Sequence, residues 1–237
     1  MLLSNLLFPR TCPFCGGYIS DQQIRETYLD WICPDCWRRL PRTEQDLKAE
    51  NSTETALTEG KTVIKKALHL NRAGAYLFYE KGHPIQQVIH RMKYRDEPEW
   101  GIYLGRQAVL GWRDERFFDE IDVIIPVPLH PKRLRERGYN QSEYIARGIS
   151  EITGIPIDTT HVVRVVNTPK QALQEGEERK KNVANAFEVI NPRELANKHI
   201  MVVDDLITTG ETMKACLKAM HSIRGVKFTV FALCKAR

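Results

Sequence analysis

Two pairs of cysteines near the start of the chain restrict its fold more than any other feature. The segments CPFC, with Cys12 and Cys15, and CPDC, with Cys33 and Cys36, are separated by 17 residues. Each C-x-x-C turn directs two sulfur atoms toward one point, and two such turns complete a closed tetrahedral site for Zn²⁺. The alternatives are two disulfides or a dithiol redox pair, but a thioredoxin-like motif would occur singly at a strand-to-helix junction. The spacing therefore predicts a structural zinc ribbon over residues 1–42.

The ribbon is followed by a polar stretch and then by a larger domain. A ribbon of about 40 residues has little core of its own, so metal binding should supply most of its folding free energy. Residues 43–70 are poor in large apolar side chains and are predicted to be a linker. With 237 residues and 42% hydrophobic content, the chain has room for one sizeable α/β core over residues 71–237.

The larger domain alternates between strand patterns and helix patterns. Strands are predicted at 73–79, 121–127, 162–166, 186–190, 200–203 and 228–234. Helices are predicted at 85–94, 100–111, 142–154 and 211–222. Apolar strands separated by helices are typical of a mostly parallel sheet that is covered by helices, in which ligands bind at the carboxyl ends of the strands.

The segment IMVVDDLITTGET, residues 200–212, places two carboxylates side by side where a buried strand is expected to end. Like charges repel, so this pair needs a partner that offsets the repulsion. The loop that follows opens a helix, and its N–H groups, hydroxyls and glycine favour a bound phosphate. The predicted phosphate- and ribose-binding residues are Asp204, Asp205, Thr208, Thr209, Gly210 and Thr212. The alternative is an acidic helix start stabilised by the helix dipole, which explains one carboxylate more easily than the whole run.

This segment resembles the phosphoribosyl pyrophosphate (PRPP) motif of type I phosphoribosyltransferases. The resemblance implies a type I phosphoribosyltransferase-like fold in which the acidic pair accepts hydrogen bonds from the ribose 2- and 3-hydroxyls. It also implies PRPP or a nucleotide as ligand, with Mg²⁺ accompanying PRPP. No residue is assigned as catalytic, because nothing in the sequence indicates a base that would activate an acceptor.

Two further segments are similar to those of the ComF family of natural competence proteins, whose relatives include the GntX-type proteins. They are PVPLHPKRLRERGYNQSEYIA, which includes the end of the strand at 121–127, and TPKQALQEGEERKKNVANAFEVI, residues 168–190. Lys93 and Tyr94 also match the family, although a Y-x-G-x-x-R element that many members carry ahead of them is missing. The resemblance implies single-stranded DNA as a partner during DNA uptake, together with a helicase-like ATPase of the ComFA type.

Basic side chains are concentrated in the same segments. The candidates for binding nucleic acid or pyrophosphate are Lys132, Arg133, Arg135, Arg137, Tyr139, Asn140, Gln141, Lys93, Tyr94 and Arg179. Cations neutralise phosphates and tyrosine rings accept stacked bases, a combination that suits single strands. For a basic run on its own, an ordinary solvated face is the alternative. The net charge of +5 and the pI near 8.9 mildly favour polyanionic partners.

Two functions remain open from the sequence. The first is a competence-type protein that binds single-stranded DNA on a phosphoribosyltransferase scaffold, and the second is an active PRPP-dependent phosphoribosyltransferase of unknown acceptor. We expect the first, because a zinc ribbon is an interaction module and no acceptor-side chemistry is evident. No apolar run approaches the roughly 20 residues that span a bilayer, and the opening MLLSNLLFPR lacks the features of a signal peptide. We therefore expect a cytoplasmic protein.

Overall fold

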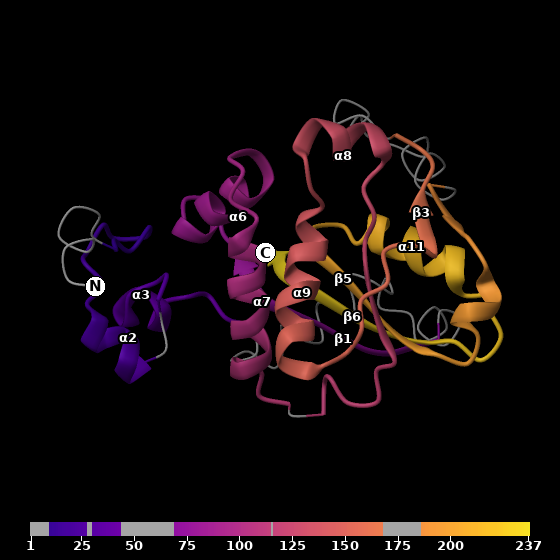
Figure 1. The fold of residues 1–237 in the computed structure, drawn as a ribbon, viewed down its shortest axis with the longest axis horizontal. Coiled ribbons are helices and arrows are strands. Elements are labelled where there is room, and N and C mark those ends of the chain that lie inside the picture. Colours follow the sequence, from indigo (N-terminus) through magenta and orange to yellow (C-terminus); the bar gives the residue numbers. More distant parts are fainter. Residues whose placement is uncertain (1–9, 28–29, 44–68, 115, 168–185) are drawn as a thin grey trace.

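A four-stranded parallel sheet forms the centre of the fold (Figure 1). The computed structural model describes residues 10–27, 30–43, 69–114, 116–167 and 186–237. The strands lie in the order β1 (Leu70–Tyr79), β6 (Lys227–Ala236), β5 (His199–Ile207) and β2 (Val123–Pro126), and all neighbours are parallel. The two central strands are buried along most of their length, as expected for a sheet covered on both faces. The predicted mostly parallel sheet is confirmed.

Alternate residues of β5 face two separate hydrophobic cores. Met201 and Val203 pack in the core that contains α7 (Glu99–Gly111) and α9 (Gln141–Thr153), whereas Ile200 and Val202 pack in the core that contains α11 (Glu211–Met220). Because side chains alternate along a strand, α11 covers one face of the sheet and the pair α7 and α9 covers the other (Figure 1). The helices thus leave the carboxyl ends of the strands as the edge at which a ligand can enter.

Glycines allow the helices α7 and α9 to cross at very short range. A Cβ atom on Gly148 would lie 2.1 Å from the carbonyl oxygen of Ile102, and a Cβ atom on Gly105 would lie 2.4 Å from that of Ile145. Either contact is far closer than van der Waals packing permits. Only glycine therefore fits at these two positions without moving one helix away from the other.

A second, smaller sheet lies beyond the carboxyl end of β2. It pairs β3 (Val162–Arg164) with β4 (Phe187–Val189) in antiparallel fashion, and the short 3₁₀ helix η2 (Pro192–Leu195) leads from it to β5. The chain between β3 and β4 contains residues 168–185, which lie outside the described part of the structure.

Two elements differ from the sequence-based expectation in ways that affect the site. The strand β5 continues through Ile207, so Asp204 and Asp205 lie within its last part and not beyond its end. It continues because Asp204 and Leu206 still pair with β6. In addition, basic residues after β2 for which no helix is predicted fold into α8 (Pro131–Arg137). This helix starts at a proline and ends before Gly138, which has the left-handed conformation with φ of 82°.

The N-terminal unit packs directly on the larger domain. It contains α2 (Asp21–Thr27) and α3 (Pro34–Arg38) and lies beside α6 (Pro84–Tyr94) and α7 (Figure 1). The Trp31 ring stacks on Tyr103 of α7 with ring centroids 5.7 Å apart. The residues that follow this unit pair with β1, since the N–H of Phe78 donates to the carbonyl of Pro41 at 2.7 Å. The unit and the domain therefore share one hydrophobic core.

No helix in the described part of the chain is both long enough and apolar enough to cross a membrane.

Candidate functional site

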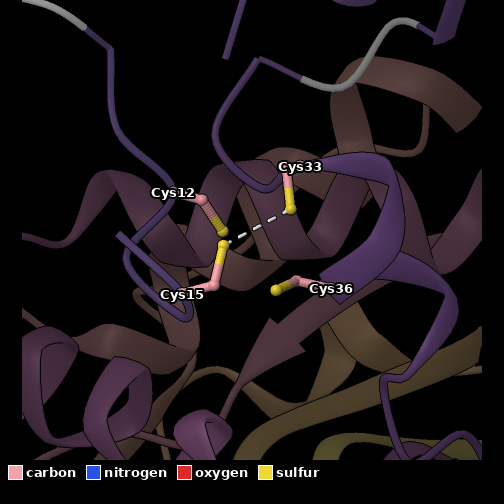
Figure 2. Close-up of side chains that lie close together, drawn as sticks. All are labelled: Cys12, Cys15, Cys33 and Cys36. Carbon is pink, nitrogen blue, oxygen red and sulfur yellow. Dashed lines mark hydrogen bonds between the residues drawn. The ribbon is translucent and has the colours of Figure 1, made fainter. Parts of the chain in front are cut away.

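The four cysteines of the N-terminal unit converge on one point (Figure 2). Their sulfur atoms all lie within 4.8 Å of one another, and the Sγ atoms of Cys15 and Cys33 are 3.7 Å apart. Tetrahedral zinc with Zn–S bonds of about 2.3 Å would place two sulfurs about 3.8 Å apart, so the donor set fits such an ion. The site could thus hold a metal such as zinc.

Local structure explains how both cysteine turns reach the same point. The first pair lies in a tight turn, in which the N–H of Gly16 donates to the carbonyl of Cys12 at 2.8 Å and Gly16 itself has a φ of 71°. The N–H of Gly17 then points at the Sγ of Cys15, at 3.4 Å. In the second pair, Cys33 immediately precedes α3 and Cys36 lies in its first turn. Four cysteine sulfurs would fill all the coordination positions of a tetrahedral ion, which is typical of a structural site.

The acidic pair of β5 is held by groups from two other elements. The Nζ atom of Lys93, in the last turn of α6, lies 2.9 Å from an Oδ atom of Asp205. The hydroxyl of Ser142, in the first turn of α9, donates to Asp204 at 3.0 Å, and the N–H of Asp205 donates to the same carboxylate oxygen at 2.8 Å. Lys93 and Asp205 are largely buried, with side chains 18% and 6% exposed. A buried cation therefore offsets much of the repulsion between the two carboxylates.

The two carboxylates do not share this cation equally. Burial of the carboxyl group, and then the charge of Asp205, raise the pKa of Asp204 to about 7. Burial by itself would lower the pKa of Lys93, but the charges of Asp205 and Asp204 outweigh it, so the pKa is raised and Lys93 stays protonated. Near neutral pH the cluster thus contains one ammonium, one carboxylate and a second carboxyl group that is close to its titration point.

The loop between β5 and α11 leads into the N-terminus of a helix. Gly210 caps α11 with a φ of 75°, and Thr208 and Thr209 are exposed beside it, while Thr212 in the first turn is partly buried. The first N–H groups of a helix have no partner within it, and the helix dipole adds positive potential there. A phosphate could therefore bind next to the acidic pair, which itself could accept hydrogen bonds from hydroxyl groups of the same ligand.

Contacts between α6 and α8 bring the two basic segments together. The guanidinium of Arg137 lies 5.3 Å from the centre of the Tyr94 ring, and one of its N–H groups donates to the side chain of Gln141 at 2.9 Å. The hydroxyl of Tyr139 donates to the carbonyl of Met92 at 2.6 Å. Residues that are more than 40 positions apart in the sequence thus form one surface.

The other candidates in these segments differ in their exposure. Lys132, Arg135 and Tyr94 are exposed, and Arg133 and Arg137 are partly exposed. Three more are buried and make internal contacts, namely Tyr139, Asn140 and Gln141. Asn140 caps α9 and its amide donates to the carbonyl of Val127 at 3.1 Å. Arg179 lies outside the described residues.

Two residues of the site were missed in the sequence. The first is Ser142, which directly follows Asn140 and Gln141 of the basic segment. Its position in the first turn of a helix that follows a strand is the signal that could have indicated it. The second is Arg164 of β3, which no local sequence pattern indicates. Burial, and then the charge of Arg133, lower the pKa of Arg164, while Asp204 opposes this shift. Arg164 also lines a cavity of about 300 Å³ between the segment after β2, the start of α9 and β3.

Comparison with known proteins agrees with this geometry. Residues 141–237, which contain α9, β5, α11 and β6, match the phosphoribosyl transferase domain family. Competence protein F of Haemophilus influenzae is 30% identical over 157 residues, which cover 65% of this chain and 69% of that protein. The chain belongs to the ComF family. The phosphoribosyltransferase-like fold that the sequence predicts is thereby confirmed, and the four-cysteine cluster is compatible with the predicted zinc ribbon.

Further proteins are similar to this ComF-family member. DNA utilization protein YhgH of Salmonella typhimurium is 29% identical over 155 residues, which cover 64% of this chain and 67% of that protein. Competence protein ComFC of Bacillus subtilis is 24% identical over 204 residues, which cover 85% of this chain and 68% of that protein. Among solved structures, UMP synthase of Leishmania donovani matches 78% of this chain and 31% of that chain at 14% identity, with a TM-score of 0.33 that is too low to add to the assignment.

Proposed function

We propose that this protein acts in competence and DNA utilization by binding single-stranded DNA on the surface that α6 and α8 form. The observation that supports this most directly is the stack of Arg137 on Tyr94, which leaves Tyr94 47% exposed. An exposed aromatic ring beside a cation offers a surface on which a base can stack. The names of the relatives in Haemophilus influenzae, Bacillus subtilis and Salmonella typhimurium agree with a role in DNA handling.

The charge around Tyr94 suits a flexible phosphate backbone. Lys132 and Arg135 of α8 and Arg95 at the end of α6 are exposed. Exposed cations beside an exposed aromatic ring bind single strands with little sequence preference, because every base has a face that stacks and every nucleotide has a phosphate. Double-stranded DNA offers no free base faces and is expected to bind more weakly.

Removing two of these cations should change the salt dependence of DNA binding. For a variant with Lys132→Ala and Arg135→Ala, the slope of log affinity against log salt concentration for oligothymidylate should become shallower by about 1.4, at about 0.7 per lost phosphate contact. Fluorescence anisotropy over a salt series measures this slope. Both side chains are exposed, so the variant should keep its fold.

The matched control changes two exposed cations on the other face of the sheet. Lys218→Ala with Arg224→Ala removes the same charge at and beyond the end of α11 and should leave the slope unchanged. Tyr94→Ala should weaken binding by about 1 to 3 kcal/mol at every salt concentration, whereas Tyr94→Phe should not, because the ring face remains. Equal slopes for the two double variants would place the DNA site elsewhere.

We also propose that the acidic pair and the loop from Thr208 to Thr212 retain a site for a ribose phosphate, such as PRPP or a nucleotide. Hydroxyl groups of the sugar would donate to Asp204 and Asp205, and the phosphate would accept from the start of α11. The match of residues 141–237 to the phosphoribosyl transferase domain family supports this assignment. The Mg²⁺ expected with PRPP stays a prediction.

Replacing one carboxylate should separate sugar binding from phosphate binding. At pH 8, above the Asp204 pKa of about 7, Asp204→Asn should weaken binding of ribose 5-phosphate by about 1.5 to 3 kcal/mol, because a hydrogen bond to a charged acceptor is lost. Inorganic phosphate, which gains from the removal of a negative charge, should bind as well or better. Titration calorimetry with the two ligands tests this. Thr209→Val, which changes only the loop, should weaken both, and an equal loss of both in Asp204→Asn would contradict the sugar assignment.

An active PRPP-dependent phosphoribosyltransferase is the second candidate, favoured by the same domain match. Pyrophosphate release from PRPP in the presence of an acceptor would demonstrate it. A helicase-like ATPase of the ComFA type remains the expected protein partner, and a cytoplasmic location remains a prediction.

A further inference from the structure

We infer that the outer face of α6 carries a nucleotide-binding pocket that extends the DNA path beyond Tyr94. This inference rests on the proposed binding of single-stranded DNA to the surface of α6 and α8. Among the described residues, the pocket is lined by Gln86, Gln87, His90, Arg91 and Arg95, and its volume is about 330 Å³. Such a volume is at the lower end of the range for small-molecule sites.

Planar side chains connect the pocket to the surface of α8. The rings of His90 and Tyr94 have their centroids 4.8 Å apart. The guanidinium of Arg137, in the last turn of α8, lies 5.3 Å from the centre of the Tyr94 ring. His90 and Tyr94 are four residues apart, so both lie on one face of the helix. The row Arg137, Tyr94 and His90 therefore leads from α8 into the pocket, and successive bases can stack along such a row.

The pocket contains the groups that one nucleotide of a strand requires. Gln86 and Gln87 offer amides that can donate to and accept from the edge of a base. The oxygen of Gln86 accepts from the N–H of Gly82 at 3.0 Å, which holds its side chain in place. The exposed guanidinium of Arg95 can bind a flanking phosphate.

The charges near the pocket favour an anionic strand over a cationic partner. Arg91 pairs with Glu97 at 3.3 Å, and Glu97 also accepts from the indole N–H of Trp100 at 3.1 Å. Arg95 is exposed at the end of α6, and Lys132 and Arg135 continue the positive charge along α8. Glu97 is thus already paired, and the exposed cations Arg95, Lys132 and Arg135 add positive charge that an anionic strand can neutralise.

The test compares oligothymidylates of increasing length by fluorescence anisotropy. For the parent protein, affinity should rise with length until the strand covers both α8 and the pocket. For Gln87→Ala with His90→Ala, the rise should end one or two nucleotides earlier, and the affinity for long strands should fall about tenfold with an unchanged salt slope. Arg95→Ala should instead make the salt slope shallower by about 0.7. All three side chains are exposed, so the variants should fold normally.

Controls on the opposite face separate this inference from the proposed function. His221→Ala and Arg224→Ala, which change exposed residues after α11, should leave length dependence and slope as in the parent. If the pocket variant also behaves like the parent while Lys132→Ala with Arg135→Ala weakens binding, DNA binding by α8 stands and the pocket is not on the path. If neither variant affects binding, the DNA surface itself is misplaced and the inference fails with it.

Discussion

A Cys33→Ser variant should lose its zinc and unfold the N-terminal unit. The parent protein should contain about one zinc per chain, and structural zinc sites contribute on the order of 10 kcal/mol or more to the folding of small domains. A serine hydroxyl is a poor replacement for a thiolate, so most of this free energy should be lost. Because Trp31 packs on Trp100 and Tyr103, unfolding of the unit should expose these rings and lower the melting temperature of the whole protein. Metal analysis and tryptophan fluorescence measure both effects.

A second cysteine provides the control for this prediction. Cys216 of α11 is fully buried in the core that this helix covers, away from the four-cysteine cluster. Cys216→Ser introduces the same change of sulfur to oxygen and should destabilise the core, yet it should retain one zinc per chain. A Cys33→Ser variant with full zinc content and an unchanged melting temperature would exclude the metal site.

Replacing Lys93 by methionine should destabilise the protein strongly and in a pH-dependent manner. At pH 8 the acidic pair has lost the cation that pairs with Asp205, and removal of one partner from a largely buried ion pair costs about 3 kcal/mol. At pH 5 Asp204 binds a proton, since its pKa is about 7, and the loss should be about half as large. Urea unfolding at the two pH values measures the difference.

The sign of this pH dependence follows from proton binding. The pKa of Asp204 is raised in the folded state, so between about pH 4 and pH 7 the native state binds more protons than the unfolded state. The free energy of unfolding therefore decreases as the pH rises through this interval, and the variant should show a steeper decrease than the parent. Lys218→Met, at an exposed position, should change stability by less than about 0.5 kcal/mol at either pH. A loss for Lys93→Met that is equal at both pH values would contradict the assigned charges.

Much of the fold could be predicted from the sequence because its signals are local. Apolar periodicity predicts the strands β1, β2, β5 and β6 and the helices α6, α7, α9 and α11. The boundaries of these elements in the structure differ from the predicted ones by only a few residues. The helix α8 was not predicted although Pro131 and Gly138 mark its ends, because it has only seven residues and no buried apolar face. The end of β5 was also predicted too early, because two adjacent carboxylates were expected to lie beyond a buried strand.

The candidate site could be predicted only in part, because its residues come from distant segments. The order of Asp204, Asp205 and the threonine loop is visible in thirteen consecutive residues. Their partners Lys93 and Ser142 are separated from them by long stretches of chain, and no local pattern pairs them. The burial of Tyr139, Asn140 and Gln141 likewise depends on how α6, α8 and α9 meet.

The sequence by itself determined the two cysteine pairs that can hold a metal, the alternation of strands and helices, and the residue types of the loop before α11, because each depends on spacing within one short segment. The tertiary structure decided which charges meet. It placed the ammonium of Lys93 on Asp205 and the guanidinium of Arg137 on Tyr94. It also decided that α7 and α9 cross at Gly105 and Gly148, and that the N-terminal unit shares its core with the domain. These contacts depend on the path of the whole backbone, since a side chain can neutralise or stack only on what the fold brings within a few ångströms of it.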